Sequence, residues 1–272
     1  MDFKGLSHSH LMAEKDYLWL HLRDLPYFRA MLRSVEAQFY QDFELSSPVL
    51  DVGCGDGHFT SIAFARPLDV GLDPWAGPIR QAARLDGYRF LVQADGGLMP
   101  FPDAYFASAL SNSVLEHIPH VESVLEETAR ILQPGGLFLF SVPNPGYLSE
   151  LSIPSWLRQL GFSSLGKIYT EWFRRMSRVH HAVEPEIWRG WLEQAGFRLD
   201  KWWHYFSPHA MRMLEWGHYF GAPTLLPHLL TGRWILVPKR WNLSLTDRLV
   251  RRHVKPVPDP LGTFTFYVAR RI

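Results

Sequence analysis

The sequence contains very little cysteine. Cys54 is the only one in 272 residues, which excludes a disulfide framework and a cysteine-rich zinc site and favours a reducing compartment. No apolar run approaches the roughly 18 uninterrupted residues that a membrane-spanning helix requires. Residues 1–10 are polar, so we expect no signal peptide. The sequence has neither internal repeats nor low-complexity tracts. We expect a single domain with insertions, located in the cytoplasm.

The chain also has almost no net charge, since 28 Lys and Arg nearly balance 27 Asp and Glu, but the net charge of +1 conceals an uneven distribution. Residues 1–150 hold 10 Lys and Arg against 19 Asp and Glu, whereas residues 151–272 hold 18 against 8. A basic C-terminal half indicates contact with something anionic. The alternative is a solvated basic surface that has no partner.

A glycine-rich turn between a strand and a helix is the most informative segment. The apolar run that ends at Asp51 predicts a buried strand, and Gly53, Gly55 and Gly57 follow it at alternate positions. Residues 58–65 then suit a helix. Glycines allow a positive φ and a close approach of a ligand to the backbone, and a helix N-terminus offers N–H groups to an anion. This order of elements predicts a nucleotide-binding turn.

The spacing of these glycines distinguishes between nucleotides. A dinucleotide-binding turn has the pattern G-x-G-x-x-G, whereas here the glycines alternate after an acidic residue. The segment resembles motif I of the class I S-adenosylmethionine (SAM)-dependent methyltransferases. The resemblance implies that Asp51, Gly53, Cys54 and Gly55 hold the methionine end of SAM, which carries a carboxylate and an ammonium but no phosphate. A glycine-rich turn without a ligand is the alternative.

Two further acidic residues follow at the same interval. Asp73 ends a predicted strand over 68–72, and Asp95 follows another over 88–93. Ligands bind at the carboxyl ends of strands in open α/β sheets. The resemblance implies that Asp73 accepts hydrogen bonds from the ribose hydroxyls, with Pro74 beside the adenine, and that Asp95 and Gly96 lie near the adenine amino group. The alternatives are a helix N-cap for Asp73 and an ordinary turn at Asp95.

The resemblance continues through residues 46–143. A fourth strand over 106–110 precedes Ser-Asn-Ser-Val-Leu-Glu-His-Ile, in which Asn112 would line the methionine end of SAM and His117 would face the site of methyl transfer. We expect a helix over 121–132, ended by the Pro-Gly-Gly turn at 134–136, and a fifth strand over 137–142.

These segments predict a fold and its organisation. We expect an α/β, Rossmann-like, doubly wound and mostly parallel seven-stranded sheet with helical cap insertions. In this single methyltransferase domain of residues 1–272, residues 1–45 form a helical leader, broken near Pro26, and residues 46–143 form the SAM-binding core. Residues 184–206 and 261–272 complete the core, and residues 144–183 and 207–260 form the cap.

The two cap insertions are rich in aromatic and basic residues. Trp234, Trp241, Arg251 and Arg252 lie in the second of them. Such a cap would surround a small-molecule or lipid acceptor, and interleaved Trp and basic residues also suit contact with an anionic membrane at its inner face. The alternative is that the aromatic residues form the core of a helical cap.

Catalysis in the resembling family depends mainly on alignment. An acceptor that must lose a proton also needs a base, and we consider His117 and His181 the candidates, each of which could instead be a polar cap or a loop residue. No metal-ligand spacing is visible, and we do not expect a nucleic-acid substrate, although the basic half does not exclude a phosphate-bearing one. The remaining alternatives are a catalytically silent SAM-binding partner protein and an NAD-dependent Rossmann oxidoreductase.

Overall fold

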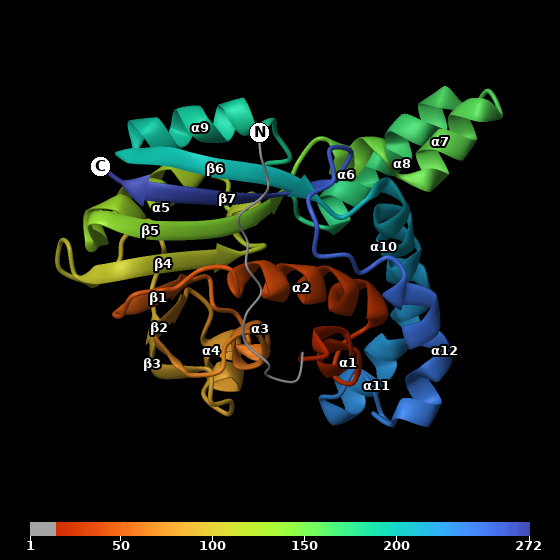
Figure 1. Ribbon diagram of the computed structural model, residues 1–272. Helices are drawn as coiled ribbons and strands as arrows, with labels where there is room; N and C mark the ends of the chain where they lie inside the picture. The colour runs from red at the N-terminus through yellow and green to blue at the C-terminus, as the bar shows by residue number, and fades with distance from the viewer. Residues whose placement is uncertain (1–14) are drawn as a thin grey trace.

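One seven-stranded sheet organises the chain, in the strand order β3-β2-β1-β4-β5-β7-β6 (Figure 1). The computed structural model describes residues 15–272. The strands are β1 (Val49–Val52), β2 (Leu68–Asp73), β3 (Tyr88–Gln93), β4 (Phe106–Asn112), β5 (Leu132–Pro143), β6 (Phe197–Tyr205) and β7 (Phe264–Arg271).

Helices connect and flank the strands. They are α1 (Tyr17–Leu22), α2 (Tyr27–Tyr40), α3 (His58–Ala63), α4 (Ala76–Ala82), α5 (Val121–Ile131), α6 (Gly146–Ser149), α7 (Ser152–Gln159), α8 (Ser163–Met176), α9 (Pro185–Gln194), α10 (Pro208–Gly221), α11 (Leu225–Thr231) and α12 (Arg240–Arg251). Two short 3₁₀ turns are η1 (Leu115–His117) and η2 (Ala222–Thr224).

The strand pairing confirms the predicted fold class. Strands β1 to β5 pair in parallel, and β7 inserts antiparallel between β5 and β6. The strand order reverses between β1 and β4, because β2 and β3 extend the sheet to one side of β1 and the later strands extend it to the other. This switch point is where open α/β sheets bind their ligands, at the carboxyl ends of the strands.

Alternation along the strands divides the core between the two faces of the sheet. Val49 joins a cluster that includes residues of α1, α2, α3 and α10, whereas Leu50 and Val52 join a second cluster with residues of α5 and α9. Successive side chains of a strand point to opposite faces, so both faces are covered and β1 is buried throughout.

The sequence predicted most elements to within a few residues, with one notable difference at β5. This strand begins at Leu132 rather than at residue 137, so the Pro-Gly-Gly turn lies inside its first part and the helix before it ends at Ile131. The pairing of β4 with β5 shifts register there, between Phe106 and Ser108. The predicted break of the leader near Pro26 separates α1 from α2, while residues 1–14 lie outside the described part.

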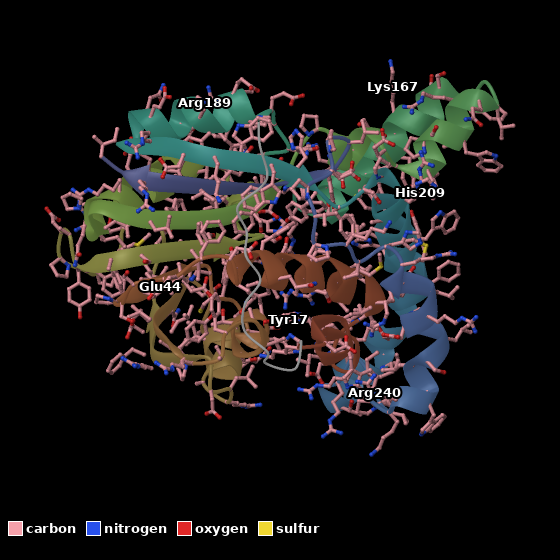
Figure 2. The ribbon with its side chains drawn as sticks, viewed as in Figure 1. Tyr17, Glu44, Lys167, Arg189, His209 and Arg240 are labelled. Atoms are coloured by element: carbon pink, nitrogen blue, oxygen red, sulfur yellow. The ribbon has the colours of Figure 1, made fainter. Side chains whose placement is uncertain are left out.

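The two long insertions are helical. Residues 144–183 contain α6, α7 and α8, and residues 207–260 contain α10, η2, α11 and α12. Figure 1 shows α7 and α8 projecting beyond the end of the sheet, and Figure 2 shows Lys167 and Arg240 directed outward from these insertions. From residue 15 onward, no helix has the length and apolar character needed to cross a membrane.

Candidate functional site

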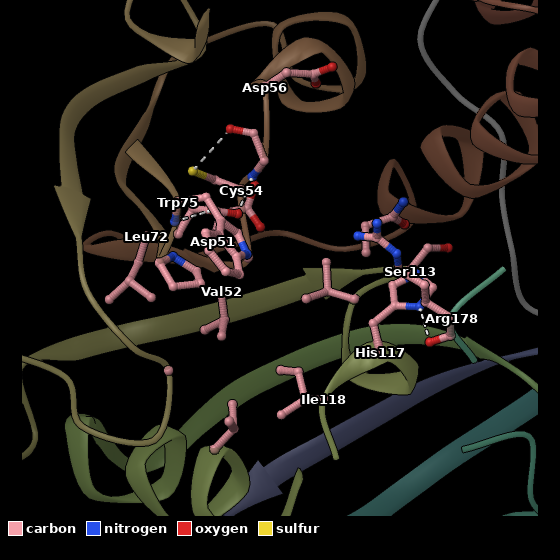
Figure 3. Close-up of a pocket in the computed structure, with 18 of the residues that line it drawn as sticks. Asp51, Val52, Cys54, Asp56, Leu72, Trp75, Ser113, His117, Ile118 and Arg178 are labelled. Atoms are coloured by element: carbon pink, nitrogen blue, oxygen red, sulfur yellow. Dashed lines mark hydrogen bonds between the residues drawn. The ribbon is translucent and has the colours of Figure 1, made fainter. Parts of the chain in front are cut away.

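A cavity of about 600 Å³ opens at the carboxyl ends of β1, β2 and β4, and we call it the cofactor cavity (Figure 3). The structure brings together at its wall all nine residues that the resemblance assigned to cofactor binding: Asp51, Gly53, Cys54, Gly55, Asp73, Pro74, Asp95, Gly96 and Asn112. Its volume falls within the range usual for small-molecule sites.

The glycine turn uses its own N–H groups to hold its shape. The N–H groups of Gly53 and Cys54 both donate to the carbonyl of Leu72, at 2.8 and 2.9 Å. That of Gly55 donates to Asp73 Oδ2 at 3.1 Å, and that of Gly57 donates to the Cys54 carbonyl at 3.1 Å. These four N–H groups are therefore occupied by hydrogen bonds within the protein. A pyrophosphate would find few donors here.

Gly55 leaves room for a ligand directly above the backbone. Its φ is +57°, and a Cβ built on it would meet no atom within 4 Å. Because Gly55 lines the cofactor cavity, that free space belongs to the cavity. Gly53 differs, since its φ is +82° and a Cβ there would clash with the side chain of Val114. Gly53 therefore permits close packing, whereas Gly55 permits close approach of a ligand.

Asp51 is buried at the end of β1 and receives two hydrogen bonds on one oxygen. Thr60 Oγ1 donates to Asp51 Oδ2 at 2.8 Å and the Tyr88 hydroxyl donates to the same oxygen at 2.5 Å. Burial raises the pKa of Asp51 to about 6, against the opposing effect of these hydrogen bonds. Oδ1 receives no hydrogen bond from residues 15–272 and can accept one from an ammonium group at the cavity wall.

This titration predicts a pH dependence of cofactor affinity. An ammonium beside Asp51 favours the carboxylate, so SAM should bind best above pH 6 and more weakly as Asp51 takes up a proton, by at most about tenfold per pH unit. Calorimetric titration with SAM between pH 5 and pH 7 measures this. In Asp51→Asn the affinity should be lower at pH 7 and nearly flat across the same range. An unchanged slope in that variant would contradict the assignment to Asp51.

Asp73 and Asp95 both stabilise the loops that follow their strands. Asp73 Oδ1 accepts from the Trp75 N–H at 2.9 Å and its Oδ2 accepts from Gly55, so it orders the turn while lining the cavity. Burial raises the pKa of Asp73. Asp95 Oδ1 accepts from the Gly97 N–H at 2.7 Å. Their contacts with ribose and adenine remain predictions.

Asn112 links the cavity to the leader helix. Its amide Nδ2 donates to Glu36 Oε2 at 2.7 Å, and Ser113 Oγ donates to Glu36 Oε1 at 2.9 Å. The Tyr205 hydroxyl also donates to Glu36 Oε1, at 2.8 Å. Burial raises the pKa of Glu36, opposed by these donors. The network fixes α2 against the end of β4 and so sets the cavity wall, a role for Glu36 that sequence reasoning missed.

A second cavity of about 290 Å³ adjoins the first, and we call it the acceptor cavity. Five residues line both: Arg33, Ser113, His117, Met176 and Ser177. The rest of its wall is mostly apolar and comes from α2, η1, the end of β5, the start of β7 and both insertions: Phe28, Leu32, Pro143, Tyr147, Val179, Leu214 and Phe264, with Arg29, Glu116 and His218.

His117 lies where the two cavities meet. Its Nδ1 is 3.0 Å from the carbonyl oxygen of Arg178 (Figure 3). A carbonyl only accepts, so Nδ1 carries the proton and Nε2 is left with a free lone pair. Burial lowers the pKa of His117, and burial also raises the pKa of the neighbouring Glu116 well above its usual range. The imidazole is therefore neutral at pH 7 and able to accept a proton.

His181, the other histidine selected from the sequence, lies outside both cavities. Its Nε2 is 2.9 Å from the Ile118 carbonyl, and its ring meets the edge of Trp191 with centroids 5.2 Å apart. The structure therefore brings His117, but not His181, to the predicted cofactor residues. A catalytic role for His181 remains a prediction that this geometry does not favour.

Sequence reasoning missed two arginines that α2 presents to the cavities. Arg33 lines both cavities and Arg29 lines the acceptor cavity. Neither forms an ion pair with any residue between 15 and 272, and Arg33 Nη1 is buried without a hydrogen-bond partner. Their spacing of one helical turn beside the apolar positions 28 and 32 was the available signal.

The residues of the cofactor cavity fit the cofactor that the resemblance implies. Asp51 suits an ammonium and Asp73 suits paired hydroxyl groups, while Arg33 can hold a carboxylate bidentately. The free space above Gly55 accepts the ligand itself. In the described part of the chain, no three His, Cys, Asp or Glu side chains lie close enough to share a metal ion.

Several known proteins are similar to this chain. A family model described as a methyltransferase domain matches residues 21–224. A fatty-acid O-methyltransferase of Mycolicibacterium smegmatis is 32% identical over 166 residues, which cover 54% of this chain and 59% of that protein. A trans-aconitate 2-methyltransferase of Methylobacterium nodulans is 34% identical over 161 residues, covering 57% and 58%. The chain thus spans somewhat more than half the length of these relatives.

A solved SAM-dependent methyltransferase of Thermotoga maritima shares the fold. It superposes with a TM-score of 0.57 at 15% identity, over 90% of this chain and 92% of that one. At this identity the similarity concerns the fold alone.

Proposed function

The chain belongs to the class I SAM-dependent methyltransferases, and from this premise we propose that it methylates a small organic or lipid-like acceptor held in the acceptor cavity. The observation that carries the proposal is the shared wall of the two cavities, where Arg33, Ser113 and His117 line both. A group bound in one cavity can therefore reach a group bound in the other without crossing solvent.

Each residue of the site has a distinct task in this proposal. Bound SAM supplies a methyl group made reactive by its sulfonium. Asp51 and Arg33 hold the ammonium and the carboxylate of its methionine part, and Asp73 orients its ribose. His117 Nε2 takes the proton of an acceptor hydroxyl, which makes that oxygen a better nucleophile. This mechanism needs no metal ion.

The volume of the acceptor cavity and the names of two relatives support a class of acceptor. About 290 Å³ is at the lower end of the volumes usual for small-molecule sites, which suits a small acceptor. Both curated relatives carry an organic acid in their names, a fatty acid and trans-aconitate. We therefore favour a small amphiphilic hydroxy acid, whose carboxylate is recognised and whose hydroxyl is the group that His117 deprotonates. Residues from both insertions support their proposed role as a cap, because Ser177 lines both cavities and Leu214 lines the acceptor cavity.

Two other functions are less well supported. An NAD-dependent oxidoreductase would need N–H donors for a pyrophosphate, and the turn has already used those of Gly53, Cys54, Gly55 and Gly57. A catalytically silent SAM-binding partner protein would have no use for a neutral histidine at the junction with a second cavity.

The direct test is product analysis by mass. The purified protein, SAM and a panel of fatty acids, aromatic hydroxy acids and their amides are incubated together, and a product heavier by one methylene supports the proposal. Calorimetry with SAM and NAD accompanies it. Binding of NAD in preference to SAM would contradict the proposal, as would SAM binding with no product from any acceptor.

We also propose that the second insertion contacts an anionic membrane from which a lipid-like acceptor enters. Exposed leucines on α11 support this, Leu229 being 79% and Leu230 being 76% exposed. The basic residue Arg251 of the same insertion is already engaged in ion pairs within the protein. Arg251 pairs with Asp16 at 3.0 Å and with Asp247 at 2.6 Å, so it holds α12 against the start of α1 rather than facing a lipid.

The apolar residues are therefore the sharper test of membrane contact. The Leu229→Asp/Leu230→Asp variant should lose sedimentation with anionic vesicles, because the buried apolar area is lost and like charge is added. Leu261→Asp is the control, since Leu261 is 73% exposed but lies in the turn before β7 rather than on α11. Failure of the wild type to sediment with anionic vesicles at low salt would contradict the proposal.

A further inference from the structure

Two like charges lie close together on the acceptor-cavity side of α2. Arg29 and Arg33 lie one turn apart on α2, and Arg33 is the first cause of a lowered pKa of Arg29, which falls to about 10. Two guanidinium groups this close repel each other. A protein retains such an arrangement at a cost in stability when a ligand compensates it.

The surroundings offer only partial compensation. Asp56 is the nearby acid, and both arginines contribute to lowering its pKa. It lies in the wall of the cofactor cavity, and neither arginine comes within ion-pair distance of it in the described structure. The methionine carboxylate of the cofactor can satisfy Arg33, which reaches both cavities. Arg29 lines only the acceptor cavity, so it still has no anionic partner among residues 15–272.

The other titratable groups of that cavity do not compensate it either. Burial favours the protonated, neutral form of Glu116, because it raises the pKa well above the usual range. His218 donates through Nδ1 to the Leu214 carbonyl at 3.0 Å, and burial lowers its pKa. His117 is likewise neutral at pH 7. The cavity therefore combines an apolar wall with an excess positive charge on α2.

We propose that Arg29 recognises a carboxylate of the acceptor, so that the acceptor cavity selects small amphiphiles with an anionic head and an apolar tail. The carboxylate lies against the guanidinium, and the tail lies along Phe28, Leu214 and Phe264. This proposal rests on the function proposed above and adds the residue that determines its specificity. Arg29 is a binding residue, whereas His117 remains the catalytic one.

Binding of octanoate and of its neutral analogue octanamide tests this assignment without requiring turnover. Both are titrated calorimetrically into protein saturated with S-adenosylhomocysteine. The wild type should prefer octanoate. Arg29→Gln should weaken octanoate by about 10- to 100-fold, the loss expected for a charge-assisted hydrogen bond, and should leave octanamide and SAM nearly unchanged. Arg29→Lys should fall between, because it keeps the charge but loses the planar fork.

A stability measurement separates a binding residue from a structural one. Since Arg33 disfavours the charged form of Arg29, the charge destabilises the folded protein throughout the range below pH 10, and this effect fades as pH rises through 10. Arg29→Gln should therefore raise the midpoint of thermal unfolding of the free protein at pH 7. Arg66→Gln, at an exposed position outside both cavities, should change neither stability nor octanoate binding.

Three outcomes would overturn the assignment: no preference of the wild type for octanoate, octanoate binding unchanged in Arg29→Gln, or SAM binding weakened as much as octanoate binding. The last would show that both arginines serve the cofactor. A protein that binds octanoate through Arg29 yet methylates no acceptor would instead contradict the proposed function and leave the anion site intact.

Discussion

Gly55→Val should abolish SAM binding while the sheet remains folded. The branched side chain would occupy the space above Gly55, where nothing lies within 4 Å, and this space is part of the cofactor cavity. The expected loss is about 3 kcal/mol or more, roughly a 100-fold or greater increase in the dissociation constant. Calorimetry with SAM measures it, and circular dichroism and thermal unfolding report on the fold.

Gly135→Val is the matched control for this substitution. Gly135 also has a positive φ, of +77°, and open space around its Cβ position, but it is exposed and lies outside the cavities. Both variants should therefore share the same backbone cost of about 1–3 kcal/mol, and only Gly55→Val should lose SAM. Equal SAM affinity in the two variants would show that the turn is not where SAM binds.

The gathering of the predicted cofactor residues at one cavity could be predicted, because it depends on local geometry. Asp51, Asp73 and Asn112 lie at the ends of strands, and parallel strands bring their carboxyl ends to one edge whatever the rest of the chain does. The glycine turn depends on three positive φ angles, at Gly53, Gly55 and Gly57. Such local requirements are visible in the sequence itself.

The acceptor half could not be predicted, because its wall is assembled from segments far apart in the chain. Phe28, Tyr147, Val179 and Leu214 meet there, and their meeting depends on how the insertions pack on α2. Arg29 looked like one basic residue on an amphipathic helix. Its interpretation depends on the absence of an ion pair with any residue between 15 and 272, which only the assembled structure reveals.

The two histidines illustrate the same limit. His117 comes five residues after the end of β4. Its place at the edge of the sheet could therefore be predicted from its position after that strand, as the resemblance implied. His181 lies at the end of an insertion whose path the sequence leaves open, and its backbone N–H donates to the Glu116 carbonyl at 3.2 Å. That bond brings the insertion beside the site but leaves the imidazole against Trp191, outside both cavities.

His117→Ala should lower turnover by about 10²- to 10⁴-fold, the usual contribution of a general base, with SAM affinity nearly unchanged. The wild-type rate should fall as pH drops below the pKa of His117. Because burial lowers that pKa, this decline should lie below pH 6.5, the ordinary value for histidine. Single-turnover rates from pH 5 to pH 8 measure both the size of the effect and the decline.

A neighbouring histidine provides the control for this substitution. His120→Ala removes an exposed histidine near the site that lines neither cavity, so it should keep the wild-type rate and pH profile. In His117→Ala the decline below pH 6.5 should disappear along with most of the rate. Full turnover in this variant would contradict general-base catalysis by His117. In that case the methylated oxygen would be one that carries no proton, such as an oxygen of the carboxylate that we propose Arg29 binds. Alignment of the two substrates alone would then account for the rate.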